Sequence, residues 1–189
     1  MHVAVIGGTG HIGSYLVPML RAAGHDVTAV SRGERAPYHD DPAWGDVIGV
    51  PLDRKRAELE GVFGEEVAAL AADAVVDLIC FTRASCRMLA EALAGRGTRL
   101  LHCGTIWVHG HATSPPTAED DDLAPVCDYG RNKLAIQRYL LEEQADVVGE
   151  AVGLVEAAAE DEDFQRPVEH CVQERGDGGF TGFVGDLLQ

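Results

Sequence analysis

The sequence predicts an α/β fold in which helices cover a parallel β-sheet. Residues 1–145 alternate short apolar, β-branched runs with longer segments of helical period, which is typical of strands joined by crossover helices. A cluster of glycines stands between the first apolar run and the first helical segment. The length of 189 residues, with 46% hydrophobic and 24% charged residues, fits one globular domain better than two.

The expected elements follow one another in the order that crossover connections need. The predicted strands are His2–Gly7, Asp26–Ser31, Val47–Pro51, Ala74–Ile79 and Thr98–Cys103. The predicted helices are His11–Ala23, Arg54–Ala72, Ala84–Gly95 and Tyr129–Gln144. In the first helix, Ile12, Leu16 and Leu20 recur along one face that can be buried. Pro18 removes a backbone donor inside this helix, so we expect a bend or a loss of stability there.

Residues 146–189 differ in character, and we expect them to form an acidic, poorly patterned tail. From Glu142 to Gln189 the chain carries 13 acidic but only 2 basic residues. A sixth strand at Asp146–Val155 stays open, because two glycines and a glutamate interrupt its apolar pattern. Apolar residues are too scattered here to offset the entropy of ordering, so the sequence predicts a mobile tail.

The strongest local signal is the segment IGGTGHIG at residues 6–13, between the first strand and the first helix. Its spacing fits Gly8, Gly10 and Gly13 as the dehydrogenase form of a phosphate-binding turn, or Gly7, Gly10 and Gly13 as a form with one more residue. Glycine lets the backbone approach a pyrophosphate, and the helix start offers free N–H groups. The alternative is a plain turn without a ligand. The predicted cofactor-binding residues are Gly7, Gly10, His11, Ile12 and Gly13.

The end of the second strand bears on which dinucleotide binds. A site that prefers NAD usually has Asp or Glu there to bind the ribose hydroxyls, whereas this chain has Ser31-Arg32-Gly33. The Arg32 guanidinium suits a 2′-phosphate, so the sequence favours NADP over NAD; the alternative is a solvated or adenine-stacking Arg32. Asp53, just after the third strand, is either an acceptor for the adenine edge or the N-cap of the next helix.

Tyr129 and Lys133 are candidate acid/base residues, because they lie four residues apart in a helical segment and share one face. A neighbouring ammonium favours the phenolate form of a tyrosine, which lets the phenol move a proton on or off a hydroxyl. Such a pair also occurs as an ordinary surface pair. Thr105 at the end of the fifth strand and the glycine turn after the first strand strengthen the catalytic interpretation.

Together these segments resemble the extended short-chain dehydrogenase/reductase family, also described as NAD-dependent epimerases and dehydratases. The matching segments are IGGTGHIG at 6–13, CGTIWVHG at 103–110 and DYGRNK at 128–133. The resemblance covers about residues 1–144 and implies a Rossmann-like, doubly wound parallel sheet that binds NAD(P). It implies that Tyr129 is the catalytic acid/base and that Thr105 bonds the substrate oxygen. It also implies that Lys133 holds the nicotinamide ribose and favours the Tyr129 phenolate.

The chain departs from that family in several places. His109 replaces the usual tyrosine of a Val-Tyr-Gly segment, and Gly104 stands where serine is frequent. The family normally continues into a smaller C-terminal substrate domain with an Arg-Pro segment, but Arg166-Pro167 lies too far along and follows no apolar strand. We therefore expect the substrate domain to be missing, with 1–145 as an NAD(P)-binding domain and 146–189 as the tail.

Charge, apolar patterning and cysteine content exclude several protein classes. The net charge of −16 argues against nucleic-acid binding. No apolar run approaches the roughly 20 residues needed to cross a bilayer, which predicts a cytoplasmic protein without membrane contact. The five scattered cysteines are expected to be reduced thiols. His102, His109 and His111 lie close in sequence, but we interpret them as packing or loop residues, and we expect no metal site.

Three hypotheses of function follow. The first is an oxidoreductase, epimerase or dehydratase that uses NADP or NAD and acts on a hydroxyl or carbonyl carbon, for which a nucleotide sugar is one candidate substrate. The second is a dinucleotide-binding module without turnover, and the third is a truncated fragment. The expected partners are a dinucleotide and a small-molecule substrate, and a homodimer stays open. The substrate itself cannot be read from this sequence.

Overall fold

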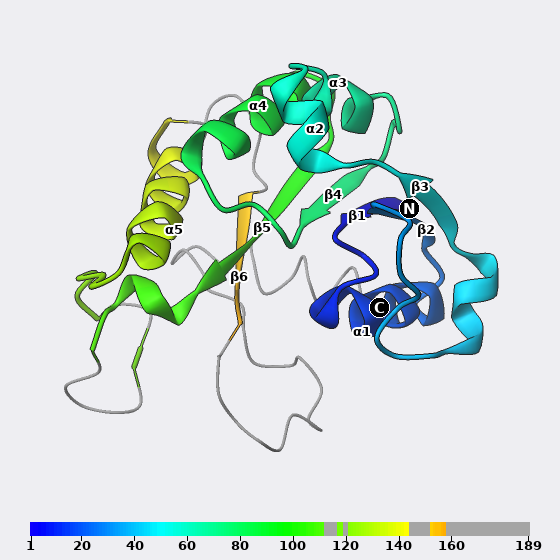
Figure 1. Cartoon of the computed structure of the whole chain (residues 1–189), viewed down its shortest axis with the longest axis horizontal. Coiled ribbons are helices and arrows are strands. Elements are labelled where there is room, and N and C mark those ends of the chain that lie inside the picture. Colours follow the sequence, from blue (N-terminus) through cyan, green and yellow to red (C-terminus); the bar gives the residue numbers. More distant parts are fainter. Residues whose placement is uncertain (112–116, 119–120, 144–151, 158–189) are drawn as a thin grey trace.

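The computed structural model places six strands in one sheet with helices on both faces (Figure 1). It describes residues 1–111, 117–118, 121–143 and 152–157. The strands are β1 (His2–Ile6), β2 (Asp26–Ser31), β3 (Ile48–Pro51), β4 (Ala74–Asp77), β5 (Arg99–Thr105) and β6 (Val152–Ala157). The α-helices are α1 (His11–Ala22), α2 (Arg54–Leu59), α3 (Phe63–Ala68), α4 (Arg83–Leu93) and α5 (Asp128–Arg138). Shorter helical turns are η1 (Pro42–Asp46), η2 (Ile106–Val108) and the π-helical η3 (Tyr139–Glu143).

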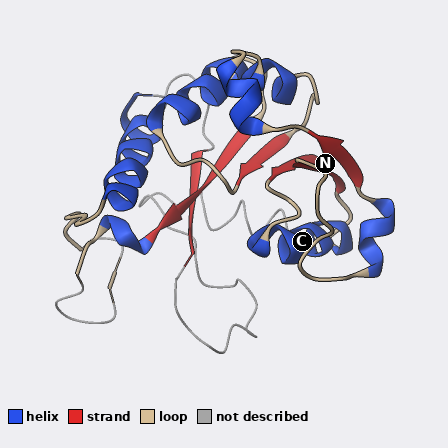
Figure 2. Cartoon of the chain, viewed as in Figure 1, coloured by secondary structure: helices blue, strands red, loops and turns tan. Residues whose placement is uncertain are grey.

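The strands run parallel in the order β3-β2-β1-β4-β5-β6, which is the doubly wound arrangement. Side chains alternate between the two faces of each strand. Helices cover both faces of the sheet (Figure 2). In β1, Val3 and Val5 pack with residues of α1, whereas Ala4 and Ile6 pack with residues of α2 to α5. Burial on both faces explains why the sequence shows continuous apolar runs instead of alternation.

The parallel order brings the carboxyl ends of the strands to one edge of the sheet. Because β1 lies between β2 and β4, the connections leave β1 toward opposite sides, and a crevice forms at this switch point. The glycine turn after β1 therefore lies beside the loop after β4. The ends of β2, β3 and β5 lie along the same edge, so the predicted site residues come from neighbouring strand ends.

The predicted Rossmann-like sheet is confirmed, and the strand predicted at Asp26–Ser31 has the predicted bounds. The helix predicted over Arg54–Ala72 is wrong as a single element. Two short helices, α2 and α3, occupy this segment, and Gly61 separates them with a φ of +73°. A left-handed glycine of this kind is a usual helix terminator. The strand predicted at Ala74–Ile79 ends at Asp77, which frees the following residues to form the loop at the crevice.

The structure also answers two questions that the sequence left open, about a sixth strand and about Pro18. A sixth strand is present at Val152–Ala157, where it pairs in parallel with β5 from Leu100 to Thr105. The sheet thus continues beyond residue 145, the boundary expected from the sequence. The predicted tail after β6 lies outside the described residues. α1 continues through the buried Pro18, so this proline does not end the helix.

Other expectations concern the covalent and membrane state of the chain. Cys80, Cys86 and Cys127 are free thiols, and Cys171 lies outside the described residues. In the part of the chain that the structure describes, no helix is long and apolar enough to span a membrane.

Candidate functional site

The glycine turn joins β1 to α1 as a tight loop held by backbone hydrogen bonds. The Gly7 N–H donates to the Val30 carbonyl at 2.8 Å, and the Gly10 N–H donates to the Gly7 carbonyl at 2.9 Å. Gly7 has a φ of +84°, a conformation that residues with a Cβ rarely adopt. A Cβ on Gly7 would also lie 2.8 Å from the Ile79 side chain. The geometry therefore favours Gly7 as the first glycine of the turn.

Gly13 sets how closely α1 approaches this turn. A Cβ there would lie 2.6 Å from the Gly7 carbonyl oxygen and would also collide with the Gly8 carbonyl oxygen, so no side chain fits. Gly10 precedes α1 in an extended conformation and makes no side-chain cap, so the first N–H groups of the helix, from His11 on, have no partner within it. The positive end of the helix dipole faces the turn, which suits an anion.

A cavity of about 710 Å³ opens beside the glycine turn. Its wall combines the turn with the ends of β2 and β3 and with the loop after β4, so it occupies the crevice at the switch point. Ile12 and Gly13 lie in α1 behind this wall. The predicted cofactor-binding residues that line the cavity are Gly7, Gly10, His11, Arg32 and Asp53.

Arg32 and Asp53 lie at the strand ends on the far side of this cavity. The Arg32 side chain is half exposed and forms an ion pair with Glu34 at 3.3 Å. Arg35, Arg54 and Lys55 line the same cavity, so four cationic side chains border it. The Asp53 carboxylate accepts the Arg56 N–H at 3.1 Å and caps α2. The N-cap alternative is therefore correct, and the remaining carboxylate lone pairs still border the cavity.

Thr105, Tyr129 and Lys133 lie near the carboxyl end of β5. Thr105 ends β5, and its hydroxyl oxygen accepts the Trp107 N–H at 3.4 Å, which starts the turn η2. Lys133 is 3% exposed, and its ammonium donates to the Cys103 carbonyl at 2.8 Å. The Lys133 Nζ lies 5.9 Å from the Tyr129 ring centroid, so the predicted acid/base pair is brought together. Tyr129 itself is 42% exposed and accessible from solvent.

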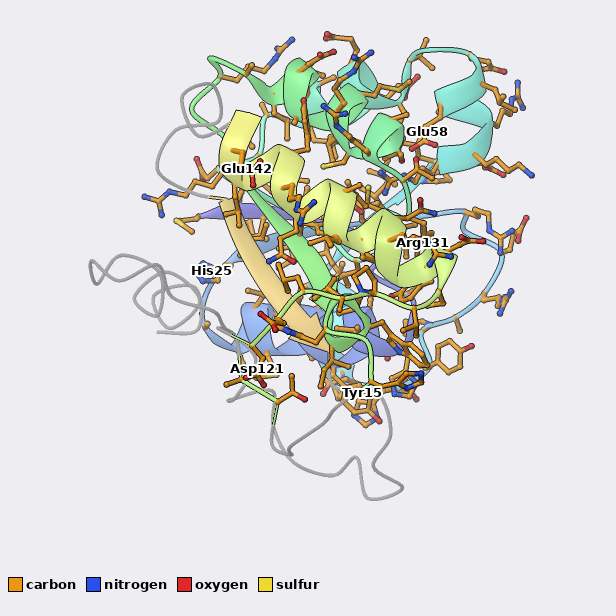
Figure 3. The ribbon with its side chains drawn as sticks, turned by 90° about the vertical axis from the view of Figure 1, so that its left-hand side faces the viewer. Tyr15, His25, Glu58, Asp121, Arg131 and Glu142 are labelled. Carbon is orange, nitrogen blue, oxygen red and sulfur yellow. The ribbon has the colours of Figure 1, made fainter. Side chains whose placement is uncertain are left out.

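Gly130 brings α5 against the turn that follows Thr105. A Cβ at Gly130 would lie 2.9 Å from the Pro125 side chain and would collide with the Trp107 carbonyl oxygen. The absence of a side chain thus allows the start of α5 to rest directly on η2. This contact sets the position of Tyr129 relative to Thr105, since one precedes Gly130 and the other precedes η2. Figure 3 shows α5 beside β5 and β6, with Arg131 near its start and Glu142 beyond its end.

Replacement of Gly130 by alanine is expected to destabilise the protein by about 1–3 kcal/mol, the usual range for forced overpacking. The added methyl group must push α5 away from the Trp107 carbonyl, which outweighs the better helix propensity of alanine. Urea unfolding measures the change. Gly45→Ala is the matched control, because a Cβ at Gly45 meets nothing within 4 Å. Equal stability of the Gly130→Ala and wild-type proteins would contradict the close contact.

Phe81 is a residue of this site that sequence reasoning missed. It follows β4, lines the cavity and is 52% exposed. Its ring centroid lies 6.4 Å from that of Tyr129, at an interplanar angle of 48°. The Lys133 Nζ lies 5.4 Å from the Phe81 centroid. Phe81 therefore connects the cavity with the predicted acid/base pair. An isolated aromatic residue in a loop gives no periodic signal by which sequence reasoning could have found it.

A buried ion pair under the cavity was also missed. The Arg54 Nη1 donates to both carboxylate oxygens of Asp77, at 2.7 and 2.9 Å, and the Arg54 Nε donates to Glu58. Glu58, which Figure 3 labels, in turn accepts a hydrogen bond from the Ser85 hydroxyl in α4. The Arg54 guanidinium also lies 4.6 Å from the centroid of the Phe63 ring. Burial alone would lower the pKa of Arg54, but the charge of Asp77 raises it above its ordinary value.

Burial lowers the pKa of two side chains near the end of β5, His102 and Lys133. Burial, together with the nearby charges of Lys133 and Arg54, lowers the pKa of His102 to about 3, so its imidazole is neutral at neutral pH. Neither ring nitrogen has a hydrogen-bond partner among the described residues. Burial also lowers the pKa of Lys133. Over the described ranges, no three His, Cys, Asp or Glu side chains gather as metal ligands.

Comparison with known proteins relates this geometry to a family. A profile of the NAD-dependent epimerase/dehydratase family matches residues 3–155. The 2′-dehydrokanamycin reductase of Streptomyces kanamyceticus is 32% identical over 152 residues, which are 80% of this chain and 41% of the reductase. The dTDP-6-deoxy-L-talose 4-dehydrogenase (NAD(P)(+)) of Kitasatospora kifunensis is 32% identical over 150 residues, which are 70% of this chain and 44% of the dehydrogenase.

A solved structure from Burkholderia cenocepacia J2315, provisionally named an epimerase, shares the fold with a TM-score of 0.64. It is 28% identical and covers 82% of this chain, whereas the match covers 52% of that structure. The chain thus spans about half the length of the relatives it matches.

Proposed function

The chain belongs to the NAD-dependent epimerase/dehydratase family, and from this premise we propose that it binds NAD(P) and acts on a hydroxyl or carbonyl carbon of a sugar. The proposal rests on what lies together at the carboxyl edge of the sheet. There the cavity of about 710 Å³ at the glycine turn lies next to a buried ammonium and an accessible phenol. The names of the reductase and dehydrogenase relatives, both acting on sugar derivatives, support the substrate class.

The residues around the glycine turn fit a dinucleotide. No Cβ can be accommodated at Gly7 or Gly13 without a collision, so the backbone there is bare and can approach a pyrophosphate. The first turn of α1 begins at the same place, with the positive end of the helix dipole toward the glycine turn. Asp53 borders the region where the adenine would lie, and His11 lies between it and the helix start. We propose that these groups, with Ile12 behind them, hold the dinucleotide.

Tyr129 is proposed to be the proton donor and acceptor. NAD(P), when bound, supplies or takes up the hydride at the reacting carbon. In a reduction the Tyr129 hydroxyl gives its proton to the carbonyl oxygen and becomes a phenolate, and in an oxidation the phenolate takes the proton back. The buried Lys133 ammonium beside the ring stabilises the phenolate by charge, and we propose that it also holds the nicotinamide ribose. The Thr105 hydroxyl is proposed to orient the substrate oxygen.

NADP is proposed as the preferred cofactor. Arg32, Arg35 and Lys55 border the cavity at the ends of β2 and β3, where a 2′-phosphate on the adenosine ribose would lie. Arg32 currently pairs with Glu34, an exposed contact of the kind that contributes little to stability. A phosphate offers the guanidinium a stronger, bidentate partner. The cost of exchanging Glu34 for a phosphate is therefore small.

Calorimetry is expected to show that NADPH binds more tightly than NADH by about tenfold or more, the effect of one or two charge-assisted hydrogen bonds. Arg32→Asp should reverse this order, because it removes the phosphate partner and adds an acceptor for ribose hydroxyls. Arg87→Asp is the control, since it makes the same charge change at an exposed residue of α4.

The possible outcomes test the cofactor, the role of Arg32 and the catalytic activity separately. If neither dinucleotide binds to the wild-type protein, the cofactor assignment fails. Equal affinities for the two would remove only the role of Arg32. Tight binding without turnover of any sugar carbonyl or alcohol would favour a dinucleotide-binding module. We further propose that the binding domain extends through Ala157, because β6 belongs to the same sheet.

A further inference from the structure

The loop after β4 exposes a large aromatic side chain at a place where apolar surface is costly. Phe81 is followed by Thr82, which caps α4, and its ring remains 52% exposed. Its neighbours Cys80 and Ile79 are turned into the protein and are largely buried, so the loop has apolar anchors without it. Packing of the core therefore does not explain why a phenylalanine stands here.

The ring of Phe81 lies against the Lys133 ammonium. Lys133 Nζ is 5.4 Å from the Phe81 centroid and 5.9 Å from the Tyr129 centroid, both within the range of cation–π attraction. The two rings are 6.4 Å apart and tilted by 48°, so the ammonium lies near both. The Cys103 carbonyl accepts a hydrogen bond from the ammonium at 2.8 Å. We call Phe81, Tyr129 and the Cys103 carbonyl the lysine cage.

The cage accounts for the near-complete burial of a cation close to a solvent-open cavity. Lys133 is 3% exposed although Phe81 lines the cavity and Tyr129 is 42% exposed. A lysine side chain has four rotatable bonds and a strongly hydrated head, so an open neighbourhood would let it turn toward water. The ring of Phe81 lines the cavity and lies within cation–π distance of the ammonium, so a π face stands where water would otherwise be.

We propose that Phe81 is a positioning residue, whose ring keeps the Lys133 ammonium dry and directed at the ring of Tyr129. This inference rests on the proposed function, because it assigns a purpose to the geometry of the acid/base pair. Phe81 acts through Lys133 and takes no part in proton transfer itself. Its effect is to hold one orientation of the ammonium before a ligand arrives.

The surroundings of Lys133 predict in which direction its pKa changes when the Phe81 ring is removed. Burial is the main cause that lowers the pKa of Lys133. Loss of the ring would remove a cation–π attraction that favours the ammonium, but it would also let water reach the ammonium, and we expect this larger effect to raise the pKa toward the ordinary value for lysine. Titratable or charged groups reach Lys133 from several elements, and all of them remain in place when only Phe81 is changed. These groups are Tyr129 of α5, His102 and Cys103 of β5, Asp77 of β4, Cys80 after β4 and Arg54 of α2.

The sequence makes this test unusually direct, because Lys55 and Lys133 are the only lysines among the 189 residues. Protein labelled with ¹³C at the lysine side chains gives one signal for each, and Lys55→Arg assigns them. Lys55 is exposed and serves as the internal reference. In the wild-type protein without ligand, the Lys133 signal is expected to titrate at lower pH than an ordinary lysine, because burial lowers its pKa.

Three variants then test the cage. Phe81→Ala should move the Lys133 midpoint upward toward the ordinary value for lysine, whereas Phe81→Tyr, which keeps the ring, should restore the wild-type value. Phe81→Leu keeps apolar bulk if the alanine variant folds poorly, and it should give an intermediate midpoint. An unchanged Lys133 midpoint in folded Phe81→Ala or Phe81→Leu would overturn the proposal.

A second measurement connects the cage with turnover. The pH at which turnover is half-maximal should move in Phe81→Ala in the same direction as the Lys133 midpoint, and Phe81→Tyr should restore it. A merely structural role would lower turnover equally at every pH and would thus count against the proposal. Absence of dinucleotide binding to the wild-type protein would refute the proposed function alone, since the lysine titration decides the role of Phe81 without any cofactor.

Discussion

Tyr129→Phe is expected to lower turnover by a factor of about 10²–10⁴ or to abolish it, the range associated with loss of a general acid or base. The substitution removes one oxygen atom and keeps the ring that contacts Phe81 and Lys133. NADPH affinity should therefore stay within a few-fold of the wild-type value. Steady-state kinetics and calorimetry on the same protein preparation measure the two quantities separately.

Two further variants show whether this effect belongs to the phenol of Tyr129. Tyr15→Phe is the matched control, because Tyr15 is equally exposed at 41% but lies on α1, where it stacks on His39. It should leave turnover unchanged. Lys133→Met should weaken both turnover and NADPH binding, since the ammonium is proposed to contact the phenol and the ribose. Full activity of Tyr129→Phe would show that the Tyr-x-x-x-Lys motif is not catalytic here.

Asp77→Ala is expected to destabilise the fold by about 3–5 kcal/mol, the usual cost of leaving a buried charge without its partner. Asp77 is 2% exposed, and both of its oxygens accept from Arg54, whose side chain is only 10% exposed. The Ile79 N–H also donates to Asp77, so the loop after β4 loses a contact as well. Urea unfolding of the variant and wild-type proteins gives the difference.

A double substitution distinguishes the ion pair from other effects of the Asp77 change. Replacing Arg54 by methionine and Asp77 by leucine together should cost less than Asp77→Ala alone, because neither charge of the buried pair remains and Glu58, the other partner of Arg54, keeps the Ser85 hydroxyl as a donor. Asp26→Ala is the control: Asp26 pairs with Arg21 at 3.3 Å but is 87% exposed, and its loss should cost no more than about 1 kcal/mol. A loss below this level for Asp77→Ala would contradict the buried pair.

The strands were predictable because burial on both faces leaves a strong signal in the sequence. β2 has the predicted bounds, and the β-branched runs identified the centre of the sheet. The prediction of one helix over Arg54–Ala72 was wrong because the apolar residues on both sides of Gly61 share a helical period. Gly61, with its positive φ, nevertheless ends the first helix. The prediction of β6 stayed open because its local sequence pattern is weak. Its pairing with β5 decides its structure, and the glycine at position 153 obscures the local pattern.

The candidate site was predictable where a motif fixes spacing along the chain. The glycine turn and the Tyr129–Lys133 pair depend on neighbours in sequence, so their geometry follows from one turn and one helix. Phe81 and the Arg54–Asp77 pair depend on contacts between distant segments, which spacing does not encode. Asp53 shows an intermediate case. Its position before a helix predicted a cap, and the cap is present, yet the same carboxylate also borders the cavity.

The position of β1 between β2 and β4 also has a consequence for synthesis on the ribosome. β1 can pair with β2 as soon as residue 31 has emerged, but its other edge must wait for β4, which ends at Asp77. At about 5–20 residues per second, this interval lasts roughly 2–9 s. Throughout it the most apolar strand of the nascent chain presents an unpaired edge, which is a template for aggregation. The same strand order that creates the crevice therefore creates a need for protection during translation.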